Sequence, residues 1–199
     1  MMKNYERYLN TTPAQYDSET LVSFFCRLLP DRKIVPLLTA LGGKKILDVG
    51  LGTGRYTSLL LSKNIVIGVD RNPHLCSLPI KMYKGDAARL SSVVNGEKFD
   101  VVLSTWMTEY LNSEQMTAFF AEVKKVLTLD GLFITTVISR FGLGFIYVKS
   151  AALLKGIDKY AYSKRQISHK MRKAGFDDFR IIDLNSWFCV PWAYLVIAK

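Results

Sequence analysis

The stretch ILDVGLGTGRYTSLLL, Ile46 to Leu61, places Gly50, Gly52 and Gly54 at alternate positions between an apolar run and a run with helical spacing. A glycine turn after a strand lets backbone N–H groups at a helix N-terminus approach a ligand without obstruction by Cβ atoms. A turn that binds a dinucleotide such as NAD would need the spacing G-x-G-x-x-G. This stretch reads G-x-G-x-G, so the main sequence evidence for an NAD-binding site is missing. The stretch predicts a strand, a turn and a helix, and a tight turn without a ligand is the alternative.

Apolar runs alternate with helical patterns along most of the chain. The first five predicted strands are almost continuously apolar, which is typical of a parallel sheet covered by helices on both faces. The alternation predicts βαβ units and a doubly wound α/β sheet. The strands are KKILDVG, NIVIGVD, IKMYKGD, FDVVLST, GLFITTVIS, FRIIDL and AYLVIAK, and the helices between them are GRYTSLLLSK, DAARLSSVV and NSEQMTAFFAEVKKVL. Asn112 or Ser113 is expected to cap the last of these helices, and Gly131 to end the connection after it.

Length and composition favour one domain over residues 1–199, because 199 residues with 49% hydrophobic content can bury one sizeable core. We expect a helical N-terminal segment over residues 1–41, with its helix at roughly 18–41, and a basic, apolar insertion over residues 140–163. The first residues show no secretory signal, and the apolar stretch around Lys149 is too short to span a bilayer. The sequence therefore predicts a cytoplasmic protein.

Few side chains are available for metal binding or for a histidine-based triad. Cys26, Cys76 and Cys189 stand far apart, and His74 and His169 are the two histidines of the chain. These spacings do not match a zinc site or a Ser-His-Asp arrangement, so we expect no metal and assign no catalytic residue.

The net charge of +10 is concentrated in one region. Residues 140–173 contain nine Lys and Arg against Asp158 alone, and so carry most of the excess. A basic region of this kind is compatible with an anionic membrane, an acidic substrate or nucleic acid.

The spacing of LDVGLGTG resembles the first motif of the class I S-adenosylmethionine (SAM) dependent methyltransferases, D/E-x-G-x-G-x-G. Asp48, Gly50, Gly52 and Gly54 match its four defining positions, and Leu51 stands where many members carry Cys. The resemblance implies SAM as cofactor, S-adenosylhomocysteine (SAH) as product, and a seven-stranded sheet in which only the last strand is antiparallel.

Further positions of the resemblance follow in order, so that it is continuous from residue 44 to about residue 139. Asp70 ends IVIGVD, where the family's acid accepts hydrogen bonds from the ribose hydroxyls, and Arg71 follows it. Asp86 would accept from the adenine amino group, with the Ala87 N–H against the ring, and Asp86 is also a candidate helix cap. Ser104 ends FDVVLS, where the family lines the methionine side of the pocket. Asp70 is alternatively a cap for the turn that follows it.

Three aromatic residues are candidates for the acceptor pocket. Tyr16, in PAQYD, resembles a lid residue of the family, or else packs against the next helix. Trp106 and Tyr110 follow the fourth strand, and Tyr110 stands where many small-molecule members carry His. The chain has neither N-P-P-Y nor a Pro-Cys pair at this strand end, which leaves small-molecule or lipid-like acceptors.

The insertion over residues 140–163 is compatible with several kinds of binding partner. Its apolar run over 141–159, with Lys149, Lys155 and Lys159, predicts an interfacial helix on an anionic membrane, a cover for an acidic hydrophobic acceptor, or a solvated helix face. The nearby aromatic residues make an RNA methyltransferase the alternative. A SAM-binding sensor or assembly protein without transferase activity is the alternative of a different class.

Overall fold

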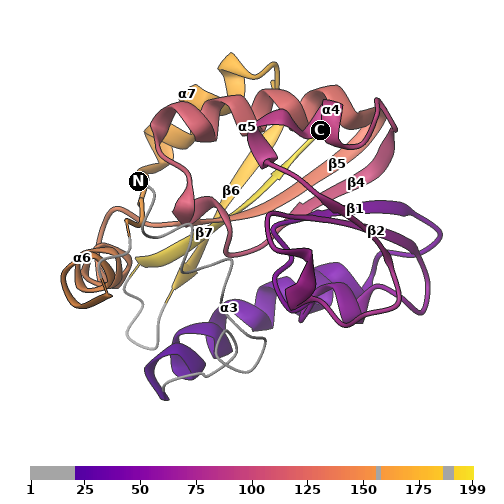
Figure 1. Ribbon diagram of the computed structural model, residues 1–199. Coiled ribbons are helices and arrows are strands. Elements are labelled where there is room, and N and C mark those ends of the chain that lie inside the picture. The colour runs from indigo at the N-terminus through magenta and orange to yellow at the C-terminus, as the bar shows by residue number, and fades with distance from the viewer. Residues whose placement is uncertain (1–20, 156–157, 186–190) are drawn as a thin grey trace.

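The computed structural model describes residues 21–155, 158–185 and 191–199, and the structural statements below refer to these residues. A seven-stranded sheet crosses the molecule in the order β3-β2-β1-β4-β5-β7-β6 (Figure 1). The strands from β3 to β5 are parallel to their neighbours, and β7 is antiparallel to both β5 and β6. The strands are β1 (Lys45–Val49), β2 (Ile65–Asp70), β3 (Lys81–Lys84), β4 (Phe99–Ser104), β5 (Leu127–Ile138), β6 (Phe179–Asn185) and β7 (Pro191–Ala198). This arrangement confirms the doubly wound sheet and its single antiparallel strand.

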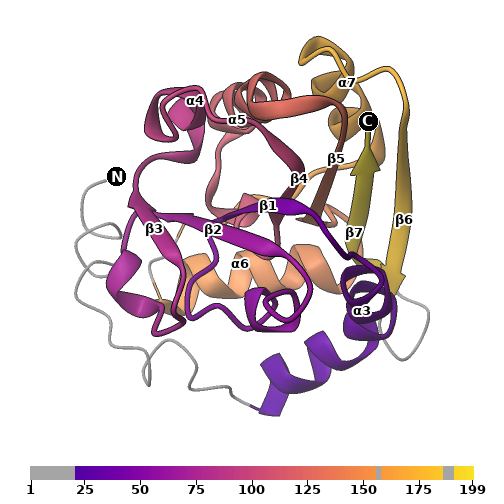
Figure 2. The ribbon, with the colours of Figure 1, turned by 90° about the vertical axis from the view of Figure 1, so that its right-hand side faces the viewer.

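Helices cover both faces of the sheet, as Figures 1 and 2 show. One face carries α4 (Leu90–Val93), α5 (Ser113–Val126) and α7 (Lys164–Lys173), and the other carries α3 (Leu21–Thr39) and α6 (Leu143–Lys155). Side chains alternate between the two faces along each strand. Leu47 therefore packs with the α5 side, and its neighbour Ile46 packs with the α3 side.

Aromatic side chains fill the core between the sheet and α5. Phe119 and Phe120 of α5 meet Phe133 of β5 edge-on, with ring centroids 5.8 and 5.6 Å apart, and Phe133 stacks on Phe176. All four rings are fully buried. Rings of this size supply most of the apolar area that holds α5 and α7 against the sheet.

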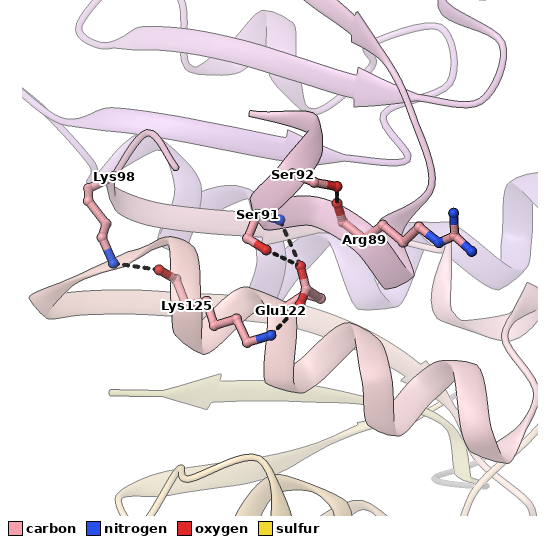
Figure 3. A network of polar contacts seen from close by, with 6 residues as sticks. All are labelled: Arg89, Ser91, Ser92, Lys98, Glu122 and Lys125. Carbon is pink, nitrogen blue, oxygen red and sulfur yellow. Dashed lines mark hydrogen bonds and ion pairs between the residues drawn. The ribbon is translucent and has the colours of Figure 1, made fainter. Parts of the chain in front are cut away.

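A polar network ties α4 to α5 at the edge of this core (Figure 3). The Glu122 carboxylate accepts from the Ser91 backbone N–H at 2.8 Å and from the Ser91 hydroxyl at 2.6 Å, and it pairs with Lys125 at 2.7 Å. Lys98 donates to the Lys125 carbonyl. Lys125 and the other donors lower the pKa of Glu122, although its burial opposes this change.

The helix ends follow the expected capping chemistry. Asn112 caps α5 through the N–H groups of Glu114 and Gln115, and the Gln115 side chain accepts from the Asn112 N–H in return. Asn112, one of the two candidates, is thus the cap. Ser163 and Gln166 form the same reciprocal box at α7. None of the helices in the described residues combines the length and the hydropathy that a membrane span requires.

Two expectations about the secondary structure were wrong, one about a helix and one about the start of a strand. GRYTSLLLSK forms turns around a 3-10 helix, Thr57–Leu59, because the Asn64 amide takes the Leu60 carbonyl that a continuing helix would need. β5 begins at Leu127, so Gly131 lies inside the strand and does not precede it. A register shift between Phe99 and Val101 of β4 accommodates the earlier start.

Candidate functional site

The glycine turn joins the end of β1 to the 3-10 helix Thr57–Leu59. Gly50, Gly52 and Gly54 have φ values of +71°, +57° and +83°, which lie in the left-handed region that favours glycine. A Cβ at Gly50 would lie 2.2 Å from Cγ of Met107, which follows β4. The turn thus lies at the carboxyl edge of the sheet, between the ends of β1 and β4, and Met107 packs closely against it.

Asp70, the last residue of β2, is buried beside this turn. Its Oδ2 accepts the Gly52 N–H at 3.0 Å, and its Oδ1 accepts the Asn72 N–H at 2.8 Å. Asp70 therefore orders the turn and places a carboxyl group at the same edge of the sheet.

Asp86 lies just beyond β3. Its Oδ1 accepts the Ala88 N–H at 2.9 Å and caps the 3-10 helix Ala87–Arg89, while its Oδ2 pairs with Arg71 at 2.6 Å. The expected capping role is confirmed. Arg71 follows Asp70 directly, so this ion pair connects the ends of β2 and β3.

Two buried polar atoms at the edge lack partners. Asp48 Oδ2 accepts the Thr57 hydroxyl at 2.6 Å, but neither Asp48 Oδ1 nor the Ser104 hydroxyl has a hydrogen-bond partner among the described residues. Burial raises the pKa of Asp48 to about 7, the bond from Thr57 opposes this rise, and the negative charge of Asp70 adds to it. A buried polar atom without a hydrogen-bond partner costs free energy. A further polar group that bonded to these two atoms would remove that cost.

The side chain of Trp106 is fixed where the chain leaves β4. Trp106 has a φ of +57°, which is strained for a bulky residue, and its N–H donates to Thr136 Oγ1 at 2.7 Å. Its indole N–H donates to the Tyr56 hydroxyl at 2.9 Å, which donates to Asp31 of α3 at 2.6 Å. Burial and the Asp31 carboxylate raise the pKa of Tyr56, so the hydroxyl keeps its proton and this relay stays intact.

A buried ion pair joins the segment after α6 to the segment after β4. Lys159 pairs with Glu109, and the two side chains are 7% and 5% exposed. The Lys159 ammonium also contacts the Tyr147 hydroxyl and lies over the rings of Tyr147 and Tyr110, 4.3 and 4.8 Å from their centroids. Burial lowers the pKa of Lys159, but the negative charge of Glu109 and the contact with Tyr147 raise it by more, to about 12. Lys159 therefore stays charged and holds α6 beside Tyr110.

Residues 47–135 match a family model described as methyltransferase domain. The match covers the glycine turn, Asp70, Asp86 and β4, in the order that the first motif predicts. Residues 47–135 thus form a methyltransferase domain. A comparison with curated proteins found no match.

Solved structures share the fold of this methyltransferase over nearly its whole length. A SAM-dependent methyltransferase of Thermotoga maritima, described as a possible histamine N-methyltransferase, is 20% identical with a TM-score of 0.73, and the alignment covers 100% of this chain and 99% of the other. Magnesium protoporphyrin IX methyltransferase of Synechocystis PCC 6803, solved with bound SAH, is 18% identical with a TM-score of 0.69, over 98% and 92% of the two chains. A SAM-dependent methyltransferase of Archaeoglobus fulgidus is 16% identical with a TM-score of 0.69, over 94% and 97%.

The donors that SAM carries match the acceptors at the edge of the methyltransferase sheet. SAM presents an ammonium group, a ribose diol and an adenine amino group, all hydrogen-bond donors. The edge presents the carboxylates of Asp48, Asp70 and Asp86 at the ends of β1, β2 and β3, and Asp48 Oδ1 has no partner among the described residues. A charged donor beside Asp48 would favour its ionised form. The residues present therefore fit SAM.

The methyltransferase brings most of the predicted site residues to this one edge. The turn residues Gly50, Gly52 and Gly54 lie there with Asp48, and Leu51 packs against β2, where its Cδ1 would lie 3.1 Å from a Cβ at Gly68. The other predicted cofactor-site residues at this edge are Asp70, Arg71, Asp86, Ala87 and Ser104.

On the acceptor side, Trp106 and Tyr110 flank Met107 in the segment that follows β4. Tyr110 is partly exposed, and Tyr16 lies outside the described residues.

Two interactions of the methyltransferase were missed at the sequence level. The Asp31–Tyr56–Trp106 relay spans α3, the glycine-turn segment and the end of β4, and the Glu109–Lys159 pair joins residues 50 positions apart. Glu109 and Lys159 were visible in the sequence, as part of Glu-Tyr-Leu and of the basic region. No local spacing indicated that they would meet.

Proposed function

We propose that the protein transfers the methyl group of SAM to a small-molecule acceptor that enters beside Trp106 and Tyr110. The observation that carries this proposal is the convergence of the glycine turn, three strand-end carboxylates and the unpartnered Asp48 Oδ1 at one sheet edge of the described residues. The acceptor side begins directly next to that edge, since Met107 contacts Gly50 and is the neighbour of Trp106.

Each cofactor-site residue has a proposed role. Asp70 accepts from the ribose hydroxyls, and Asp86, oriented by Arg71, accepts from the adenine amino group. Asp48 receives the ammonium group. The positive φ values of the glycines keep the turn backbone open for the methionine part. In the same proposal the Ala87 N–H faces the ring, and Leu51 and Ser104 line the pocket.

Bound SAM supplies an electrophilic methyl group on a sulfonium, which is transferred by in-line displacement. The protein contributes by alignment and by exclusion of water, and such positioning is worth on the order of 7–11 kcal/mol. Glu109 is a poor candidate for a general base, because its carboxylate is neutralised by Lys159 in a buried pair. We therefore infer an acceptor whose attacking atom is already ionised or carries a free lone pair.

Calorimetry with SAM and SAH, followed by a methyl-transfer screen with labelled SAM, tests the proposal. The screen should compare phenols, carboxylates, amines and lipid acids with a structured RNA. Asp70→Asn is the test variant, and Asp100→Asn is its matched control, because Asp100 lies near the start of β4, at the opposite edge of the sheet, where it accepts the Lys45 N–H. Cofactor binding without turnover of any acceptor would favour the SAM-binding sensor, and turnover of RNA alone would favour the RNA methyltransferase.

A second proposal concerns the outer face of α6 and of the turn before it. We propose that this face contacts an anionic bilayer. Phe141, Phe145, Ile146 and Leu153 are exposed there, Leu153 at 85%, with Lys149 among them. Residues 140–157 contain no acidic side chain. Exposed apolar groups beside cations suit a negatively charged membrane surface.

Sedimentation with vesicles tests this contact. The protein should bind vesicles that contain an anionic lipid more strongly than purely zwitterionic ones, and Ile146→Ser should weaken that binding. Leu129→Ser is the matched control, because Leu129 is 99% exposed in β5. Equal losses from the two variants, or no preference for anionic vesicles, would contradict the proposal.

A further inference from the structure

A groove of about 370 Å³ lies between the start of α5 and the first two turns of α7. It is lined by Ser113 of α5 and by Arg165, Gln166, His169 and Lys170 of α7. The two helices that line it, α5 and α7, lie on the same face of the sheet as α4 (Figure 1), and none of its lining residues belongs to the predicted cofactor site. Neither the glycine turn nor the acceptor side uses any of these side chains.

Lys170 places a buried positive charge in the wall of the groove. The residue is 7% exposed, and its ammonium donates to the Ser113 carbonyl and hydroxyl at 2.7 Å each and to the Thr117 hydroxyl at 3.0 Å. These acceptors are neutral, and no acidic side chain of the described residues forms an ion pair with Lys170. Burial lowers the pKa of Lys170, and the charge of Lys173 adds to that effect. A buried charge without a counterion is costly.

The helix that Lys170 contacts increases this cost. Ser113 is the first residue of α5, a helix of 14 residues whose N-terminus carries a partial positive charge. An ammonium at this position is therefore repelled by the helix dipole, although its hydrogen bonds are satisfied. The fold itself supplies no charge that compensates for this arrangement within the described residues.

Arg165 and His169 add two more donors to the same groove. They stand four residues apart on α7, so their side chains project from neighbouring turns of one face. Both are exposed, and within the described part of the chain neither forms a hydrogen bond or an ion pair. α7 contains five Lys and Arg and no acidic residue.

The surrounding acidic side chains leave the groove positive. Glu114, in the first turn of α5, lines a neighbouring groove with Tyr160 and Tyr162. Asp183 pairs with Lys164 at 2.7 Å and so compensates a different residue of α7. An anion would therefore be attracted to the Arg165, His169 and Lys170 end, away from Glu114.

We propose that the groove between α5 and α7 binds the phosphate group of a small phosphomonoester. Arg165 and His169 donate to the phosphate oxygens, and Lys170 contributes its charge from the wall. A phosphate near neutral pH carries close to two negative charges, which balances the charges of Arg165 and Lys170 better than a single carboxylate does. The site is independent of the methyl-transfer proposal, because it shares no residue with it.

Proton NMR of the histidine rings tests this site on the full chain, since the protein has only two histidines, His74 and His169. His74→Gln assigns the two sets of resonances. Titration with inorganic phosphate at pH 7 and constant ionic strength should shift the His169 resonances saturably and leave those of His74 unchanged. Arg165→Gln should raise the dissociation constant about tenfold, as expected for the loss of a charged hydrogen bond. Lys63→Gln, which removes one exposed charge elsewhere, should leave it unchanged.

Two further ligands separate the sources of phosphate. Phenyl phosphate, a phosphomonoester, should behave as inorganic phosphate does, and a short single-stranded oligonucleotide without terminal phosphates should have little effect. Shifts of both histidines in parallel, or an equal response in Arg165→Gln, would overturn the proposal. A response to the oligonucleotide but not to phosphate would assign the groove to nucleic acid instead.

Discussion

Replacement of Asp48 by asparagine should stabilise the protein at alkaline pH far more than at acidic pH. The Asp48 carboxyl is completely buried at the end of β1, and burial raises its pKa from 3.8 to about 7. The unfolded chain therefore releases this proton at lower pH than the folded chain does. Between these two pKa values the folded state binds more protons, so stability falls as the pH rises.

The size of the effect follows from the two pKa values. Each pKa unit corresponds to about 1.36 kcal/mol, so the complete difference is about 4 kcal/mol above pH 7 and vanishes below pH 4. Between pH 5 and pH 8 the wild-type protein should lose about 2–3 kcal/mol through this group alone. The amide of the Asp48→Asn variant would keep an oxygen that accepts the Thr57 hydroxyl and has no proton to release, so the variant should not show this loss.

Urea unfolding at several pH values between 5 and 8 measures the prediction. The difference in the free energy of unfolding between Asp48→Asn and wild type should grow by about 2–3 kcal/mol over this range in favour of the variant. Ser104→Ala is the control, because Ser104 is equally buried at the end of β4 but does not titrate. If the difference in the free energy of unfolding between Asp48→Asn and wild type stayed constant with pH, the Asp48 carboxyl would not have a pKa raised by burial, and this prediction would be refuted.

Three further predictions concern the cofactor turn and the buried ion pair. Asp70→Ala should weaken SAM binding by roughly 1–3 kcal/mol in calorimetry, since a hydrogen-bond acceptor is lost, and unchanged affinity would remove Asp70 from the site. Gly52→Val should abolish SAM binding while the far-ultraviolet circular dichroism stays folded, because φ is +57° there; normal binding would exclude the turn as the cofactor loop. Lys159→Met should lower the free energy of unfolding by about 3–5 kcal/mol, because it leaves Glu109 buried and unpaired. The double variant Glu109→Gln/Lys159→Met should recover most of that loss, and an equal loss in both would argue against the ion pair.

Local patterns in the sequence were sufficient for the sheet and the cofactor turn. All seven strands contain the apolar runs that predicted them, and the parallel direction of the first five follows from their alternation with helices. The antiparallel last strand was implied by the family resemblance and not by periodicity. The glycine turn was predictable because neighbouring residues determine its conformation, and glycines stand at the positions where φ is positive. Asp70 and Asp86 were predictable because parallel strands bring their carboxyl ends to one edge.

The acceptor side was not predictable in the same way, because long-range contacts build it. Trp106 is held by Tyr56 and Asp31, which lie 50 and 75 residues earlier. Lys159 counted as one of many basic residues in its region, and its burial depends on how α6 folds back against the sheet. The segment GRYTSLLLSK also ends through contacts outside its own pattern, because the Asn64 side chain that takes the Leu60 carbonyl is held by Lys44 and Leu41, 20 and 23 residues earlier.

The packing of α6 determines how its function can be tested. Its inner face belongs to the core, because a Cβ at Gly144 would lie 2.4 Å from the carbonyl oxygens of Ser139 and Trp192, and the Tyr147 ring packs 5.1 Å from Trp192. Deletion of residues 141–158 would uncover that core and remove Tyr147, which contacts Lys159. Loss of SAM affinity in such a deletion would then reflect damage to the fold and would not separate the two binding roles. Substitutions on the outer face leave these contacts in place, so they are the variants that can distinguish an acceptor or membrane role of α6 from its structural one.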